Sequence, residues 1–191
     1  MYRYFLIQPE WLDELVIKPL LFILPVIIYQ YFRNSLNTRT LGLEAKDKKL
    51  IVVWGGGFGG FLVLENLIVS LIRHQQFRFD LLQPNSLLLV LGVSIATAFS
   101  EEVLYRGFIL GQLQKSIQRG WLANSYCALL FSLGHLSVSL FKLHYQGIQL
   151  ISYLFLVFVL GFANGFIYDR TRSVYASTLA HTLWNFSVSL M

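Results

Sequence analysis

Long apolar runs separated by short polar stretches make up most of this chain. Each run is about 20 residues long, the length that an α-helix needs to cross the hydrocarbon core of a bilayer. Repeated runs of this kind predict an all-α fold, a polytopic bundle of transmembrane helices, because helices satisfy their own backbone groups in lipid. We expect about six membrane spans, at about Val16–Phe32, Leu50–Ile72, Leu87–Leu113, Trp121–Phe141, Ile148–Tyr168 and from Val174 to the C-terminus.

The composition supports a membrane protein. The 191 residues are 55% hydrophobic and 13% charged, whereas a soluble domain usually carries about 25% charged residues. A chain of this length has room for one compact bundle. We divide it into residues 1–85, with the first and second spans and their loops, and residues 86–191, a core with the later spans.

The net charge of +5 is better explained by membrane orientation than by a nucleic-acid partner. Lys and Arg are more numerous in the loops after the first, third and fifth spans than on the opposite side. Because cytoplasmic loops are enriched in these residues, that side is expected to be cytoplasmic and both termini to lie outside. We expect an integral, multi-pass protein in contact with membrane lipid, in the plasma or inner membrane if the source is prokaryotic.

Ionisable residues interrupt the third span in the stretch Ser100–Gly111, SEEVLYRGFILG. Charged side chains at membrane depth are rare and usually mark function. Glu102 and Arg106 are four residues apart, so they share one helix face and can pair within the helix. Glu101 points about 100° away, and it must find a partner on a neighbouring helix.

Two later spans also carry polar residues. His135 ends the sequence FSLGH in the fourth span, and His181 and Asn185 share one face of the last span in HTLWN. In an antiparallel bundle the polar faces of these spans and of the third would converge on one interior cavity. An unpaired polar group in lipid is destabilising by several kcal/mol, so their joint presence indicates a shared function.

A carboxylate beside imidazoles is suited to activating water. Glu101 can act as general base and His135 can orient the water, while His181 and the Asn185 amide can donate to a developing oxyanion. This set suits hydrolysis of a peptide bond. Glu101, His135 and His181 are also ligand types that zinc binds, so a divalent metal stays open as a cofactor, as does a site without one. The chain has no HExxH motif.

Small and polar residues elsewhere in the spans predict helix packing. The run Gly55–Gly60, GGGFGG, fits the nucleotide-binding pattern GxGxxG but lies in an apolar span without a preceding strand. We interpret four glycine pairs as close helix contacts: Gly55/Gly59, Gly56/Gly60, Gly107/Gly111 and Gly161/Gly165. For Glu65 and Asn66 we prefer a hydrogen-bonding role between helices over a catalytic one.

The polar motifs resemble those of the CAAX prenyl protease and bacteriocin-processing family of intramembrane proteases, also called the Abi family. EEVLYR at Glu101–Arg106 matches its EExxxR motif, FSLGH at Phe131–His135 its FxxxH motif, and HTLWN at His181–Asn185 its HxxxN motif. The motifs occur in the same order, with similar separation, on predicted membrane helices. The resemblance covers about residues 87–191.

This resemblance implies an intramembrane endopeptidase whose polar residues line a cavity within the bilayer. It implies that Glu101 with His135 activates water, that His181 and Asn185 stabilise the oxyanion, and that Glu102 and Arg106 support them. The substrate would be a peptide or protein, of the prenylated CAAX type or of the bacteriocin type. The mechanism stays open between a metalloprotease and a glutamate-dependent enzyme without a metal.

Two other functions remain open. One is a proteolytically inactive membrane protein of the same fold that acts as a scaffold or immunity protein. The other is a small proton-coupled transporter in which Glu101, His135 and His181 form a proton relay. Such carriers often contain internal repeats, and none is visible in this sequence.

Overall fold

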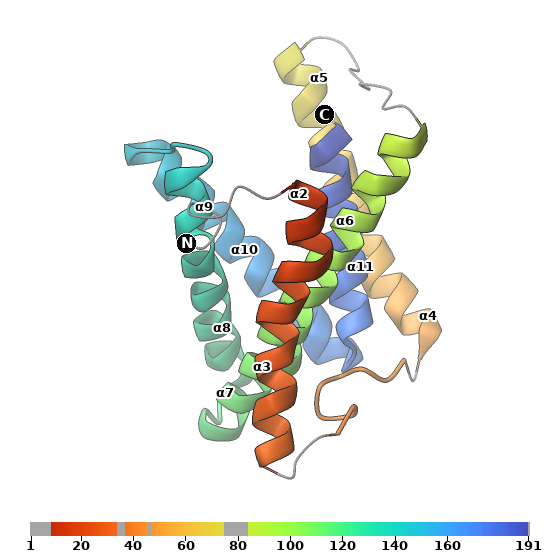
Figure 1. Ribbon diagram of the computed structural model, residues 1–191, viewed down its shortest axis with the longest axis vertical. Helices are drawn as coiled ribbons and strands as arrows, with labels where there is room; N and C mark the ends of the chain where they lie inside the picture. Colours follow the sequence, from red (N-terminus) through yellow and green to blue (C-terminus); the bar gives the residue numbers. More distant parts are fainter. Residues whose placement is uncertain (1–8, 34–36, 46, 75–83, 191) are drawn as a thin grey trace.

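The computed structural model describes residues 9–33, 37–45, 47–74 and 84–190 (Figure 1). Within these ranges the chain is a bundle of helices without a β-strand, which confirms the all-α prediction. The loop near residues 73–84, which contributes to the predicted orientation, lies mostly outside the described residues.

The helices follow one another with short connections, and several are continuous with a π-helical segment. In chain order they are α2 (Glu10–Leu12), η1 (Asp13–Ile17), α3 (Lys18–Phe32), α4 (Lys48–Ile51), η2 (Val52–Gly56), α5 (Gly57–His74), α6 (Pro84–Glu102), η3 (Val103–Leu110), α7 (Gly111–Ser116), α8 (Gly120–Gly134), α9 (Leu136–Phe141), α10 (Gly147–Thr171) and α11 (Val174–Leu190).

Among the described residues, four helical stretches are long and apolar enough to cross a membrane, at Asp13–Phe32, Lys48–Ile72, Leu87–Ser116 and Gly147–Thr171. They correspond to the predicted first, second, third and fifth spans. α8 and α11 correspond to the predicted fourth and sixth spans, but they contain only 15 and 17 residues. The fourth apolar run is also divided at His135, between α8 and α9. The predicted count of about six spans is therefore approximate.

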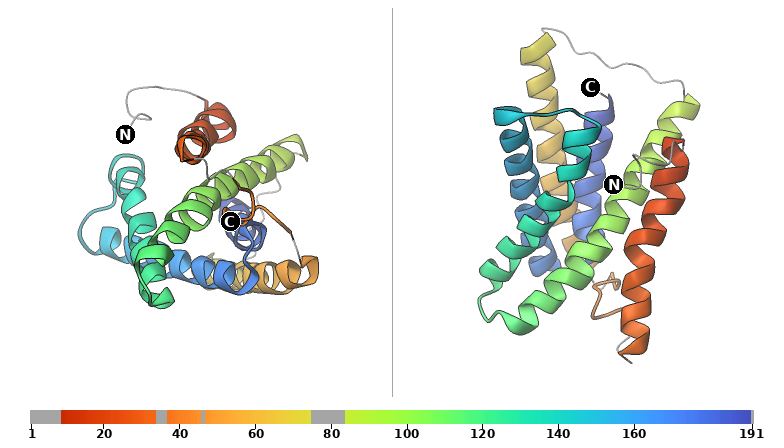
Figure 2. Two further views of the ribbon diagram at one scale, coloured as in Figure 1. Left: turned by 90° about the horizontal axis from the view of Figure 1, so that it is seen from below. Right: turned by 60° about the vertical axis from the view of Figure 1, so that its left-hand side comes forward.

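α11 lies in the middle of the bundle, where it packs against α5, α6 and α10 (Figures 1 and 2). α8 packs along α10, and the first helix, α2 to α3, packs mainly along α6 and η3. Because α11 carries HTLWN, this arrangement places its polar residues beside the end of α6, where the EExxxR motif begins.

Glycine allows α11 to approach the second helix closely. A Cβ atom on Gly55 would clash with the carbonyl oxygen of Ala176, and one on Gly59 would lie 2.6 Å from Leu183 Cδ1. These contacts confirm the Gly55/Gly59 prediction. A Cβ on Gly56 would lie 3.8 Å from Leu179 Cδ2 of α11, an ordinary contact, whereas one on Gly60 would have no neighbour within 4 Å. The predicted Gly56/Gly60 contact is therefore wrong at Gly60. The reason is rotation, because consecutive helical residues point about 100° apart and only one face meets α11.

The two remaining glycine pairs meet different neighbours. Gly161 and Gly165 lie against α8, where a Cβ on Gly165 would clash with Asn124, and this confirms a helix contact. A Cβ on Gly107 would lie 2.8 Å from the carbonyl oxygen of Leu41. The same Cβ would lie 3.4 Å from Val174 Cγ2 at the start of α11, so Gly107 contacts both the loop 37–45 and a helix, whereas a Cβ on Gly111 would meet only Thr40 of the loop, at 3.9 Å.

A hydrogen bond between side chains also joins α5 to α11. Asn66 Nδ2 donates to Ser187 Oγ over 2.7 Å, which confirms the interhelical role predicted for Asn66. Glu65 is half-buried on the same helix, and its role stays a prediction.

Candidate active site

The two adjacent carboxylates lie where α6 passes into the π-helical segment η3. Glu101 is 5% exposed and Glu102 is fully buried. Because they are consecutive in a helix, their side chains point in different directions and meet different partners. π-Helical turns are rare and are frequently found at functional sites.

Glu102 is held by donors from three helices. Its Oε1 accepts hydrogen bonds from Arg106 Nη1 at 2.8 Å and from Asn164 Nδ2 at 3.1 Å. It also accepts from His181 Nδ1 at 2.9 Å. Arg106 Nη2 in turn donates to the carbonyl of Gly161 over 2.8 Å. The predicted pair of Glu102 and Arg106 is confirmed, and it also anchors the imidazole of α11.

Glu101 finds its partner on a neighbouring helix, as predicted. Lys18 Nζ of α3 lies 2.5 Å from Glu101 Oε1 and 3.2 Å from Glu14 Oε2. The other oxygen, Glu101 Oε2, is buried 3.6 Å from His181 Nε2 and accepts no hydrogen bond from the part of the chain that the structure describes. An unsatisfied buried oxygen is destabilising, so a donor such as water is expected beside it.

His135 lies at the break between α8 and α9. Its Nδ1 donates to the carbonyl oxygen of Phe131 over 2.8 Å, because a carbonyl can only accept. The Nδ1 of His181 likewise donates to the carboxylate of Glu102. Both imidazoles are therefore anchored through Nδ1, which leaves Nε2 as the nitrogen for water or substrate.

The glycine before His135 allows η3 to approach the end of α8 closely. A Cβ on Gly134 would lie 2.5 Å from Tyr105 Oη, so a larger residue would push this hydroxyl away. Tyr105 belongs to η3, the segment that follows the two carboxylates. The close approach brings the end of α8, and His135 with it, next to the third helix.

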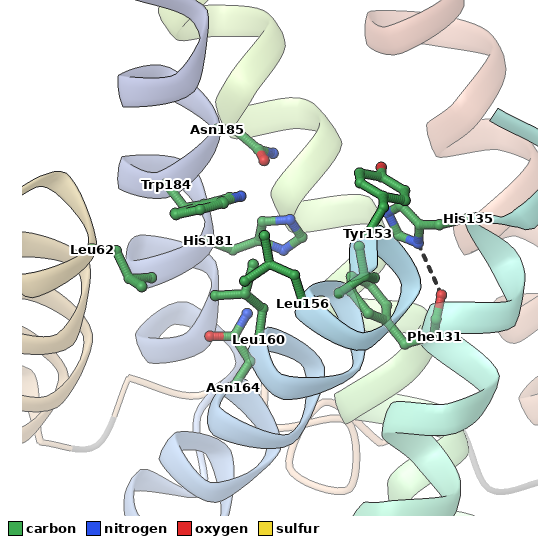
Figure 3. Close-up of a pocket in the computed structure, with 11 residues that line it drawn as sticks. Leu62, Phe131, His135, Tyr153, Leu156, Leu160, Asn164, His181, Trp184 and Asn185 are labelled. Carbon is green, nitrogen blue, oxygen red and sulfur yellow. Dashed lines mark hydrogen bonds between the residues drawn. The ribbon is translucent and has the colours of Figure 1, made fainter. Parts of the chain in front are cut away.

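Two cavities share a wall formed by His135, Tyr153, His181 and Asn185. The larger cavity, about 360 Å³, is also lined by Glu101 and Lys18. The smaller, about 110 Å³, is mostly apolar and is shown in Figure 3, where side chains from α8, α10 and α11 point into it. The structure therefore places all four residues predicted to be catalytic, Glu101, His135, His181 and Asn185, around one space; their roles stay predictions.

The metal site suggested for Glu101, His135 and His181 stays a prediction. In the described ranges no group of three His, Cys, Asp or Glu residues is placed to hold one. The ammonium of Lys18 already lies 2.5 Å from Glu101 Oε1, so a second cation at this carboxylate would be repelled. Glu101, His135 and His181 thus border one space without forming a coordination shell.

Two residues of the site carry roles that the sequence did not reveal. Lys18 lies in the first predicted span, and its charge at membrane depth was the only available signal. Asn164 interrupts the apolar second half of the fifth span, between the glycines of its pair. Neither residue belongs to one of the three motifs.

An all-helical bundle with long apolar helices and a buried cavity of carboxylates and imidazoles defines a class of membrane proteins with an internal polar site. The model of one family, Type II CAAX prenyl endopeptidase Rce1-like, matches residues 83–187, more than half of the chain. The chain belongs to this family, which confirms the resemblance seen in the motifs. No curated protein sequence and no solved structure matches the chain.

Membership in this family has two direct consequences. It is a family of endopeptidases, so the substrate is a peptide or a protein. The matched segment includes all three motifs and Asn164. It begins at residue 83, so Lys18 of the first helix lies outside it.

Proposed function

We propose that this protein is an intramembrane endopeptidase that hydrolyses a peptide bond with a water molecule activated by Glu101 and His135. One observation carries the proposal. Glu101 Oε2 is buried without a hydrogen-bond donor from the described residues, 3.6 Å from His181 Nε2, and Glu101 lines a cavity with His135 and Asn185. A buried acceptor that awaits a donor is what a water-activating base needs.

The reaction needs three groups around the scissile bond. Water donates a proton to Glu101 Oε2 while its oxygen attacks the carbonyl carbon, and Nε2 of His135 orients this water. His181, protonated on both ring nitrogens, donates from Nε2 to the oxyanion of the tetrahedral intermediate, together with the amide of Asn185. When the carbon–nitrogen bond breaks, Glu101 returns the proton to the leaving amine, so that the enzyme ends in its starting state.

Glu102, Arg106 and Asn164 support the site without touching the reacting atoms. The carboxylate of Glu102 fixes the ring of His181 through Nδ1, and the other two residues fix Glu102. A ring held in this way keeps its Nε2 directed at the same point through the reaction, which favours preorganised stabilisation of charge.

The proposed mechanism uses no metal ion. The support comes from the residues themselves, because Lys18 supplies the positive charge beside Glu101 and the two imidazoles do not complete a coordination shell with it. If zinc were nevertheless bound, Glu101, His135 and His181 are the residues of the described chain with suitable ligand types at this cavity.

A prenylated protein with a CAAX-type C-terminus is the substrate class that the family description supports, and a bacteriocin-type peptide is the alternative. The smaller cavity of about 110 Å³, lined by leucines of α5 and α10, can take an apolar side chain.

We further propose that α8 and α11 cross the membrane with the four longer helices, so that the protein is multi-pass, in the plasma or inner membrane if prokaryotic.

The test needs no assumption about the substrate. Membranes from cells that carry the wild type, Glu101→Gln or Glu65→Gln are compared for new protein termini by mass spectrometry, at equal expression. Glu65→Gln is the matched control, since it neutralises a glutamate of another apolar helix, half-buried and outside the cavity. Termini that occur with the wild type and Glu65→Gln but not with Glu101→Gln support the protease. Identical termini in all three membranes would reject it in favour of a scaffold.

A further inference from the structure

We propose that Lys18 is a positioning residue of this active site: its ammonium holds Glu101 Oε1 so that Oε2 stays directed at His181 and the bound water. This role rests on the proposed function. It assigns part of the site to the first helix, outside the segment matched by the family.

The ammonium of Lys18 is itself held in place. Its Nζ lies 2.5 Å from Glu101 Oε1 and 3.2 Å from Oε2 of Glu14, one turn earlier on the same helix. Glu14 Oε2 also accepts a hydrogen bond from Thr97 Oγ1 over 2.5 Å. Thr97 is on α6, four residues before Glu101, so the contacts form a closed link between the first helix and the helix that carries the base.

The consequence for Glu101 is directional. A carboxylate can turn about its last side-chain bond and exchange its two oxygens, unless a partner distinguishes them. The ion pair with Lys18 engages Oε1, and Oε2 is then the oxygen beside His181 Nε2. Displacements of about 1 Å in a catalytic geometry can lower a rate by about 100-fold, so the fixed orientation matters for hydrolysis.

Stability alone does not explain a lysine at this place. The side chains of Lys18 and Glu101 are 11% and 6% exposed, and a buried ion pair is often no more stabilising than a well-packed apolar pair. The neighbouring residues of α3, such as Leu20 and Leu21, are exposed apolar side chains typical of a lipid-facing helix. Apolar residues at positions 14, 18 and 101 together would suit a membrane helix bundle as well, so the presence of these three buried charges calls for a functional explanation.

The experiment compares steady-state hydrolysis by four purified proteins in lipid nanodiscs: the wild type, Lys18→Met, Lys18→Arg and Lys115→Met. The substrate is an internally quenched peptide that copies a cleavage junction found in the wild-type membranes. Lys115→Met is the matched control, because it removes the same charge from an exposed position on α7. Thermal unfolding of each protein is recorded in parallel.

Lys18→Met is expected to lower kcat by about 10- to 100-fold, with KM within about twofold of the wild type. Lys18→Arg should recover most of this loss, because a guanidinium can donate to both carboxylates. Lys115→Met should match the wild type. A purely structural lysine would change the unfolding temperature without this selective loss of kcat and its recovery by arginine.

The other possible results overturn either the positioning role of Lys18 or the proposed function itself. A Lys18→Met protein with wild-type kcat, or with a change confined to KM, overturns the positioning role while the protease stands. If wild-type membranes yield no new termini, the proposed function fails and the role of Lys18 fails with it. If Lys18→Met does not fold, Lys18→Gln and Thr97→Val replace it, and wild-type kcat in both of these would equally overturn the proposal.

Discussion

Lys18 Nζ and Glu101 Oε1 lie 2.5 Å apart, although one belongs to the first helix and the other to the third. Next to them, the carboxylate of Glu102 is bound by Arg106, Asn164 and His181. Two adjacent glutamates therefore have different surroundings. Each keeps one buried oxygen, Oε2, without a donor from the described residues, but only Glu101 lines the larger cavity and has this oxygen 3.6 Å from His181 Nε2.

The buried pair of Glu102 and Arg106 should dominate the stability of the site. Both side chains are fully buried, so Arg106→Met leaves an uncompensated carboxylate and should lower the free energy of unfolding by about 3–5 kcal/mol. Glu102→Gln combined with Arg106→Met should be less destabilised than the sum of the single variants. Thermal and denaturant unfolding in detergent micelles measures this. If the losses of the two single variants simply add in the double variant, Glu102 and Arg106 do not stabilise each other.

Asn164 should affect both stability and activity. Asn164→Ala removes one of the donors to Glu102 Oε1 and should destabilise the fold by about 1–3 kcal/mol. It should also lower kcat by about 10-fold, because the ring of His181 is held through Glu102. Asn66→Ala is the control, since it removes an interhelical hydrogen bond elsewhere in the bundle, between α5 and α11. Equal loss of kcat in the two variants would show that only helix packing is affected.

The glycines of the second helix should differ sharply in their tolerance of alanine. Gly55→Ala introduces a Cβ that clashes with the backbone of Ala176, and it should lower the free energy of unfolding by about 1–3 kcal/mol. Gly60→Ala meets nothing within 4 Å and should be neutral or stabilising by up to about 1 kcal/mol, because alanine favours helices. Thermal unfolding distinguishes them, and similar effects would disprove the close contact at Gly55.

Hydrolysis should survive removal of divalent metal ions. Because Lys18 provides the cation at Glu101, treatment with EDTA or 1,10-phenanthroline should leave kcat/KM within about twofold. The measurement uses the quenched peptide before and after dialysis against chelator, with a known zinc protease as positive control. Activity that is lost on chelation and restored by zinc would instead assign Glu101, His135 and His181 as ligands.

Much of the site was predictable because it depends on spacing within single helices. Glu102 and Arg106 are four residues apart. This spacing alone places their side chains on the same face of a helix. The same rule places His181 and Asn185 on one face of α11. Consecutive helical residues point about 100° apart, so the side chain of Glu101 points away from Arg106 and needs a partner on another helix.

The sequence by itself therefore determined the class of fold, the helices that carry polar faces and the family, because hydropathy and local spacing act within one segment. Only the tertiary structure decided that Lys18 is the partner of Glu101, that Asn164 binds Glu102, and that Gly60 faces away from α11. These contacts depend on the rotation and approach of whole helices. Apolar residues cover nearly all sides of a membrane helix, so hydropathy does not specify its rotation, and packing of small and polar side chains sets it instead.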